Sequence, residues 1–141
     1  MKLSYRYQCI FSIALISLLA GTFNYLLLRP NIMLFKITGI TATALNIKNN
    51  FMLHFLNGYF SDMAWCIAIC CIAFAFAGLN YISSRGKIFL LLLPFITEAL
   101  QYNHVISGTF DWYDILTYAL IIAVFVLFFP TLKKTFVYEK N

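Results

Sequence analysis

The chain has 141 residues, of which 62% are hydrophobic and 11% are charged, and its mean hydropathy is +0.84. About a quarter of the residues of a soluble domain are charged, and a soluble domain of this size could not bury so much apolar side chain, so composition excludes that class. The net charge of +5 does not indicate a nucleic-acid partner, because the basic residues flank apolar segments, as in membrane proteins. We predict one all-α integral membrane domain over residues 1–141.

Four apolar segments predict a bundle of four transmembrane helices. The first covers residues 9–28 and is long enough, at about 30 Å of helix, to cross one bilayer core. It is too long for the apolar region of a cleaved signal peptide, so we expect it to remain as a span. The others cover residues 63–82, 88–102 and 113–129. Pro94 interrupts the third segment, and a proline there predicts a kink.

Lysine and arginine predict the orientation of these spans. With four spans, both termini and the connection at residues 83–87 share one side of the membrane. That side holds seven of the ten basic residues, Lys2, Arg6, Arg85, Lys87, Lys133, Lys134 and Lys140. The other side holds Arg29, Lys36 and Lys48. The positive-inside rule therefore predicts cytoplasmic termini.

The stretch between the first two spans is too long for a tight connection and too apolar for a free loop. Lysines and asparagines interrupt it too often for an ordinary span. We predict an extracytoplasmic segment over residues 31–60 that is interfacial or partly re-entrant. A fifth span is the alternative, although it would break the charge asymmetry.

Four of the five acidic residues lie at the extracytoplasmic ends of the predicted spans. Glu98 and Gln101 share one face near the end of the third span, and Asp111 and Asp114 begin the fourth. Asp62 begins the second. An ionisable group inside an apolar helix is costly and usually faces a partner or a wet cavity, so Glu98 is the strongest site candidate. We expect one hydrogen-bonded cluster in which at least one acid is protonated or pairs with a positive group of a ligand.

Each of these residues also has a structural interpretation. Ser61 with Asp62, and Asp111 with Asp114, are typical of helix N-caps. Trp65 is either an interfacial anchor or part of the lining of the same pocket. The two histidines, His54 and His104, are expected to be loop residues. The cysteine spacing fits no zinc pattern, so we predict neither a metal nor a cofactor.

The sequences "TEALQ" and "GTFDWYDIL" at this bend resemble the VanZ-like family of small bacterial membrane proteins, named for a protein linked to teicoplanin resistance. The family pattern is Glu-x-x-Gln followed by Arg-x-x-Asp-x-x-Asp-Ile-Leu-x-Asn. Its matches here are Glu98, Gln101, Asp111, Asp114, Ile115 and Leu116. The chain departs from the pattern at three positions, with Gly108 for the arginine, Tyr118 for the asparagine and Ile121 for a later glycine.

The resemblance implies a multi-pass protein of the bacterial cytoplasmic membrane with a role in the cell envelope and a link to glycopeptide resistance. The four acidic residues at this face, together with Gln101 and Trp65, would then bind a lipid-linked or glycopeptide-like envelope component, or a membrane protein partner, beside the surrounding lipids. The alternative is an intramembrane enzyme in which Glu98 and Asp114 form an acid–base pair acting on a lipid-linked substrate. No HExxH, GxSxG or P-loop motif is present, which favours binding over catalysis.

Overall fold

The computed structural model describes residues 5–28, 55–106 and 109–137. This part of the chain is helical and contains no strand, so the predicted all-α class is confirmed there. Its elements are α1 (Tyr5–Leu28), a π-helical turn η1 (Leu56–Phe60), α4 (Ser61–Gly78), α5 (Ser84–Tyr102) and α6 (Trp112–Val137).

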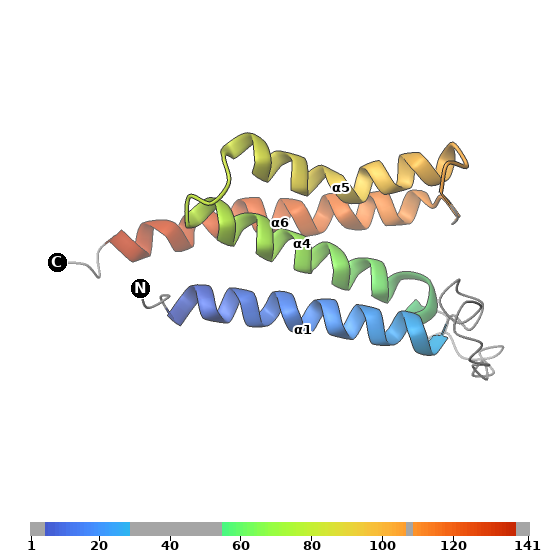
Figure 1. The fold of residues 1–141 in the computed structure, drawn as a ribbon, viewed down its shortest axis with the longest axis horizontal. Coiled ribbons are helices and arrows are strands. Elements are labelled where there is room, and N and C mark those ends of the chain that lie inside the picture. Colours follow the sequence, from blue (N-terminus) through green and yellow to red (C-terminus); the bar gives the residue numbers. More distant parts are fainter. Residues whose placement is uncertain (1–4, 29–54, 107–108, 138–141) are drawn as a thin grey trace.

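The four long helices lie side by side (Figure 1). Helices α4 and α6 run in one direction, and α1 and α5 run in the other, so α1 begins at the end of the bundle where α6 finishes. The central helix is α4, which packs against α1, α5 and α6. The acid-bearing ends of α5 and α6 and the start of α4 therefore come together at the opposite end of the bundle.

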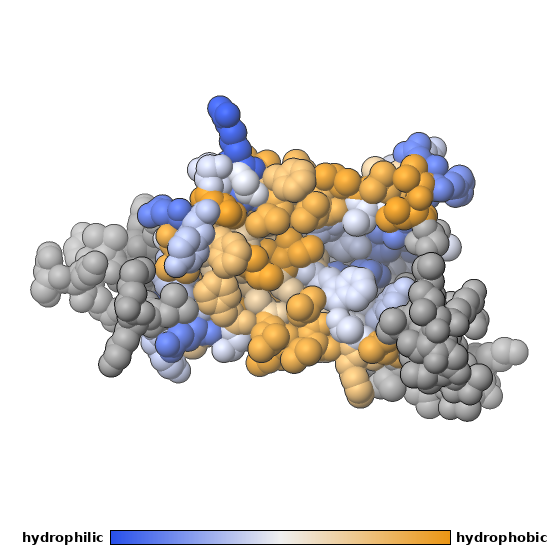
Figure 2. Space-filling view, viewed as in Figure 1, coloured by the Kyte–Doolittle hydropathy of each residue, from blue (hydrophilic) through white to orange (hydrophobic). Residues whose placement is uncertain are grey.

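In the described part of the chain, three helical segments are long and apolar enough to cross a membrane, namely Tyr5–Leu26, Gly58–Gly78 and Trp112–Phe129. Helix α5 is not one of them, because it carries Arg85, Lys87 and Glu98. Large apolar side chains are exposed on α1, α5 and α6. An apolar belt crosses the middle of the molecule (Figure 2). Such a continuous apolar surface is typical of contact with lipid, which supports the membrane class.

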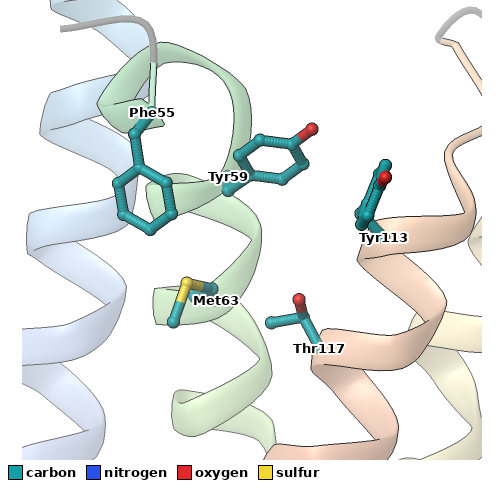
Figure 3. A pocket seen from close by; sticks show the side chains of 5 residues that line it. All are labelled: Phe55, Tyr59, Met63, Tyr113 and Thr117. Carbon is teal, nitrogen blue, oxygen red and sulfur yellow. The ribbon is translucent and has the colours of Figure 1, made fainter. Parts of the chain in front are cut away.

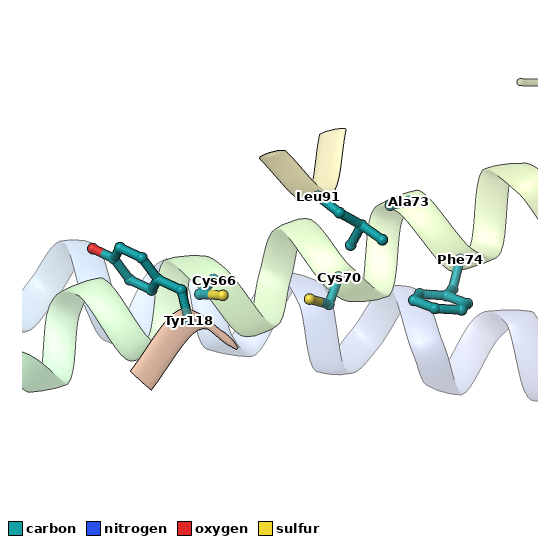
Figure 4. Packing of buried hydrophobic residues seen from close by; sticks show 6 residues of the cluster. All are labelled: Cys66, Cys70, Ala73, Phe74, Leu91 and Tyr118. Carbon is teal, nitrogen blue, oxygen red and sulfur yellow. The ribbon is translucent and has the colours of Figure 1, made fainter. Parts of the chain in front are cut away.

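The core combines three small side chains and one aromatic ring of α4 with larger side chains from α5 and α6 (Figure 4). Its buried members are Cys66, Cys70, Ala73, Phe74, Leu91 and Tyr118. Small residues allow helix backbones to approach closely, which is how helices gain contact area where burial from water gives little advantage. The buried cysteines of α4 thus act as small apolar residues.

The contact between α1 and α4 depends on Gly21. A Cβ atom at this position would lie 2.8 Å from Cδ1 and 2.9 Å from Nε1 of Trp65, and 3.1 Å from Cβ of Ala64. Nearby, Asn24 Nδ2 of α1 donates a hydrogen bond of 2.9 Å to the buried Ser61 Oγ. A glycine and a polar pair therefore fix how α1 lies on α4.

Helix α5 begins at Ser84 rather than at residue 88, and α6 runs beyond its predicted end at residue 129 to Val137. Helix α4 differs from the predicted span at both ends. Its backbone is helical from η1 onward, and Phe60 and Ser61 both have right-handed helical dihedral angles. The helix then ends at Gly78, because Asn80 adopts a left-handed conformation (φ 61°). Of the segment predicted to be interfacial or re-entrant, residues 56–60 are therefore helical, whereas residues 31–54 lie outside the described part.

Candidate functional site

Glu98 lies within the last two turns of α5 and is 3% exposed. Its Oε1 accepts a hydrogen bond of 3.4 Å from the hydroxyl of Tyr118, and its Oε2 accepts one of 3.4 Å from the backbone N–H of Asp111. Both distances are long for hydrogen bonds. The carboxylate is thus turned into the bundle and held by two groups that lie in or next to α6.

Asp111 precedes the first residue of α6 and acts as its N-cap. Its Oδ1 accepts a hydrogen bond of 2.9 Å from the backbone N–H of Tyr113, which satisfies one of the free donors at the helix start. Its Oδ2 accepts one of 3.3 Å from the hydroxyl of Tyr59 in η1. The capping interpretation is therefore correct for Asp111, and the same side chain also ties α6 to η1.

Asp114 and Asp62 complete the group of acids. Asp114 lies in the first turn of α6 and is 9% exposed. The charges of Asp62 and Asp111 act on Glu98, and those of Asp62, Asp114 and Glu98 act on the hydroxyl of Tyr118. We call these four acids, Asp62, Glu98, Asp111 and Asp114, the acidic cluster.

Two of the predicted site residues, Gln101 and Trp65, form no hydrogen bond with the acidic cluster among the described residues. The side chain of Gln101 is half-buried and forms no hydrogen bond with the described residues. Trp65 packs its ring on Tyr25 of α1, with ring centroids 5.5 Å apart, and against Gly21. The structure therefore gives Trp65 a part in the α1–α4 contact, which neither sequence interpretation included.

The predicted N-cap at Ser61 and Asp62 is wrong. The helix already runs through η1 at this point, so these residues meet no free helix terminus, and no side chain caps α4. Ser61 instead accepts the hydrogen bond of Asn24. Asp62 is the second residue of α4 and lies near enough to Glu98 for its charge to act on that carboxyl group.

Two tyrosines belong to the site and were missed from the sequence. Tyr118 lies one helical turn after Asp114, on the same face, so its spacing gave a usable signal. Tyr59 lies three residues before Asp62 in a stretch predicted to lie outside the spans. Its contact with Asp111 depends on η1 continuing α4, which no local pattern indicated.

His104 has a structural role. It follows α5 with a left-handed backbone (φ 56°), and its N–H donates to the carbonyl of Gln101 while that of Val105 donates to Leu100. These bonds close the end of the helix. In the described part of the chain, no group of three or more histidine, cysteine or acidic residues could hold a metal ion. His54 lies outside that part.

The arrangement is suited to binding a positive group. Among the described residues, neither Glu98 nor Asp111 pairs with a lysine or arginine, since each accepts only the bonds given above. The described basic residues belong to the helix ends at the far side of the bundle; they are Arg6, Arg85, Lys87, Lys133 and Lys134.

Comparison of the chain with protein-family models, with curated proteins and with solved structures finds no match.

Proposed function

We propose that this is a VanZ-like protein of the bacterial cytoplasmic membrane that binds an envelope component at the extracytoplasmic face through the acidic cluster. The component is lipid-linked or glycopeptide-like and carries a positive group, and the outcome of binding is a change in tolerance to teicoplanin-type antibiotics. The alternative ligand is a membrane protein partner that carries a basic segment.

The arrangement of helices supports four spans with cytoplasmic termini. Because α4 and α6 run in the same direction, α5 has to carry the chain back between them. Its 19 residues give about 28 Å of helix, close to the thickness of the bilayer core. The start of α1 and the end of α6 then share one side, and the surplus of lysine and arginine there makes that side cytoplasmic.

The observation that supports the proposal most directly is the burial and hydrogen bonding of Asp111. Its carboxylate is half-buried and held by Tyr59 and Tyr113, and it lies over the buried Glu98. A carboxylate offers about four acceptor positions, of which the described residues use two. Asp111 is therefore the acid that a ligand reaches, and Glu98 is the support beneath it.

The alternative of an intramembrane enzyme fits the geometry less well. An acid–base pair has to touch the reacting atoms. Glu98 and Asp114 are 3% and 9% exposed, and both oxygens of Glu98 already accept hydrogen bonds from the protein. A role in holding Asp111 accounts for this burial without a substrate.

The test is the tolerance of a teicoplanin-susceptible Gram-positive bacterium that expresses the chain. We expect the parent protein to change the inhibitory concentration of teicoplanin and Asp111→Asn to abolish that change, because the amide keeps the shape but removes the charge. Glu139→Gln, which removes an acid from the predicted cytoplasmic tail, is the matched control. Equal amounts of each variant in the membrane are verified by immunoblot. If Asp111→Asn acts like the parent, the acidic cluster does not carry the function.

A further inference from the structure

An apolar groove lies between the start of α4 and the start of α6 (Figure 3). It has a volume of about 280 Å³ and is lined by Phe55, Tyr59, Met63, Tyr113 and Thr117. This volume is close to the lower end of the range of small-molecule sites, which runs from roughly 300 to 1,000 Å³. The groove is therefore large enough for part of a ligand.

The lining of the groove is suited to a hydrocarbon chain. Three aromatic rings and one thioether form most of it, and Met63 supplies a flexible side chain that adapts to an irregular partner. The ring of Tyr59 lies between those of Phe55 and Tyr113, at centroid distances of 5.8 and 6.5 Å. These rings give a long molecule one continuous apolar path.

The groove leads to the acidic cluster, because two of its lining residues also hold Asp111. The ring of Tyr59 lines the groove while its hydroxyl donates to Asp111 Oδ2 at 3.3 Å. The backbone N–H of Tyr113 donates to Asp111 Oδ1 at 2.9 Å. A molecule with its apolar part in the groove thus has its polar part next to Asp111.

We propose that the groove holds one hydrocarbon chain of a phospholipid with a primary amine in its head group, and that the ammonium donates to Asp111. The site favours a head group with a free ammonium over one whose net charge is negative, because Asp111 lies beside a second carboxyl group, that of Glu98, whose Oε2 accepts from the Asp111 N–H at 3.4 Å. No lysine or arginine among the described residues pairs with the Asp111 carboxylate, so an ammonium would supply a positive charge there. This inference rests on the proposed function in one respect, namely that Asp111 faces a positive group of the ligand.

The experiment is a lipid competition followed by native mass spectrometry of the full-length protein. The purified protein is given equal amounts of phosphatidylethanolamine and phosphatidylglycerol with identical chains, and in a second mixture phosphatidylcholine replaces the ethanolamine lipid. We expect phosphatidylethanolamine to be retained about tenfold over phosphatidylglycerol, since a hydrogen bond to a charged group is among the stronger ones. Phosphatidylcholine, whose ammonium has no N–H, should show a smaller preference.

Substitutions at the groove and at Asp111 distinguish binding of the hydrocarbon chain from binding of the head group. Thr117→Phe fills the groove, and Leu116→Phe places the same ring on the exposed face of α6, where Leu116 is 65% exposed. Only the first should lower retention of phosphatidylethanolamine. Thr117→Leu is the milder filling variant if Thr117→Phe does not fold. Asp111→Asn should still bind the hydrocarbon chain of the lipid but lose the preference between head groups.

The inference is overturned if the groove-filling variants retain lipid as the parent does, or if Asp111→Asn keeps the preference for the amine. These failures differ from a failure of the proposed function. If Asp111→Asn abolishes the effect on teicoplanin tolerance while the filling variants bind lipid normally, only the groove inference is wrong. If Asp111→Asn leaves teicoplanin tolerance as in the parent, the proposed function is wrong whatever the lipid data show.

Discussion

Replacing Tyr118 by phenylalanine tests the support of the acidic cluster. The variant keeps the ring, which is 4% exposed and makes an edge contact with Phe95 at 6.0 Å, and removes the hydroxyl that donates to Glu98 Oε1. Glu98 then loses one of its two donors at a site with 3% exposure. A hydrogen bond to a charged group contributes about 1.5–3 kcal/mol. The O···O distance of 3.4 Å is longer than usual, so we expect a contribution at or just below the low end of that range.

We therefore predict that Tyr118→Phe lowers the free energy of unfolding by about 1–1.5 kcal/mol, which is roughly tenfold in the unfolding equilibrium. Unfolding by sodium dodecyl sulfate in mixed micelles, followed by tryptophan fluorescence, measures this difference. Tyr81→Phe is the control, because Tyr81 is 67% exposed and removal of its hydroxyl should have no effect. If the two variants are equally stable, Tyr118 does not support Glu98 and the description of the cluster is wrong.

Two further predictions concern packing and orientation. Gly21→Ala should lower the free energy of unfolding by roughly 1 kcal/mol, because overpacking against Trp65 outweighs the better helix propensity of alanine. The control is Gly58→Ala, whose added Cβ has no atom within 4 Å and should not lower stability in the same detergent titration. In a cysteine-free background, a membrane-impermeant thiol reagent applied to intact cells should label Gly108→Cys but not Ser84→Cys. The reverse labelling pattern would place the acidic cluster in the cytoplasm and refute the orientation.

The helices could be predicted from the sequence because their signal is local. Continuous apolar segments bounded by charged or polar residues are enough to indicate the apolar helices at Tyr5–Leu26 and Trp112–Phe129. The start of α4 was misplaced for a physical reason. Asn57, Gly58 and Ser61 are typical of a turn followed by an N-cap, yet the chain stays helical there, and the hydrogen bond between Asn24 and Ser61 replaces the cap.

The site was partly predictable, since each acid could be placed on its own helix. The N-cap at Asp111 follows from its position immediately before an apolar helix, and Glu98 stands out as a carboxylate inside one. What joins them was not predictable, because the hydrogen bonds from Tyr118 and Tyr59 depend on how three elements pack. Side-chain spacing within one helix gives no information on the distance from those side chains to a neighbouring helix.

The carboxylate of Glu98 lies between two helix ends that act on it in opposite ways. Near the C-terminal end of α5 the helix dipole disfavours a carboxylate, but the Oε2 atom accepts from the N–H of Asp111 and so lies at the N-terminus of α6. That terminus carries the equivalent of roughly half a positive charge. Asp111 and Asp114 lie at the same terminus, so three carboxylates share that partial charge. An ammonium group bound at Asp111, as proposed for the lipid head group, would add positive charge at this point.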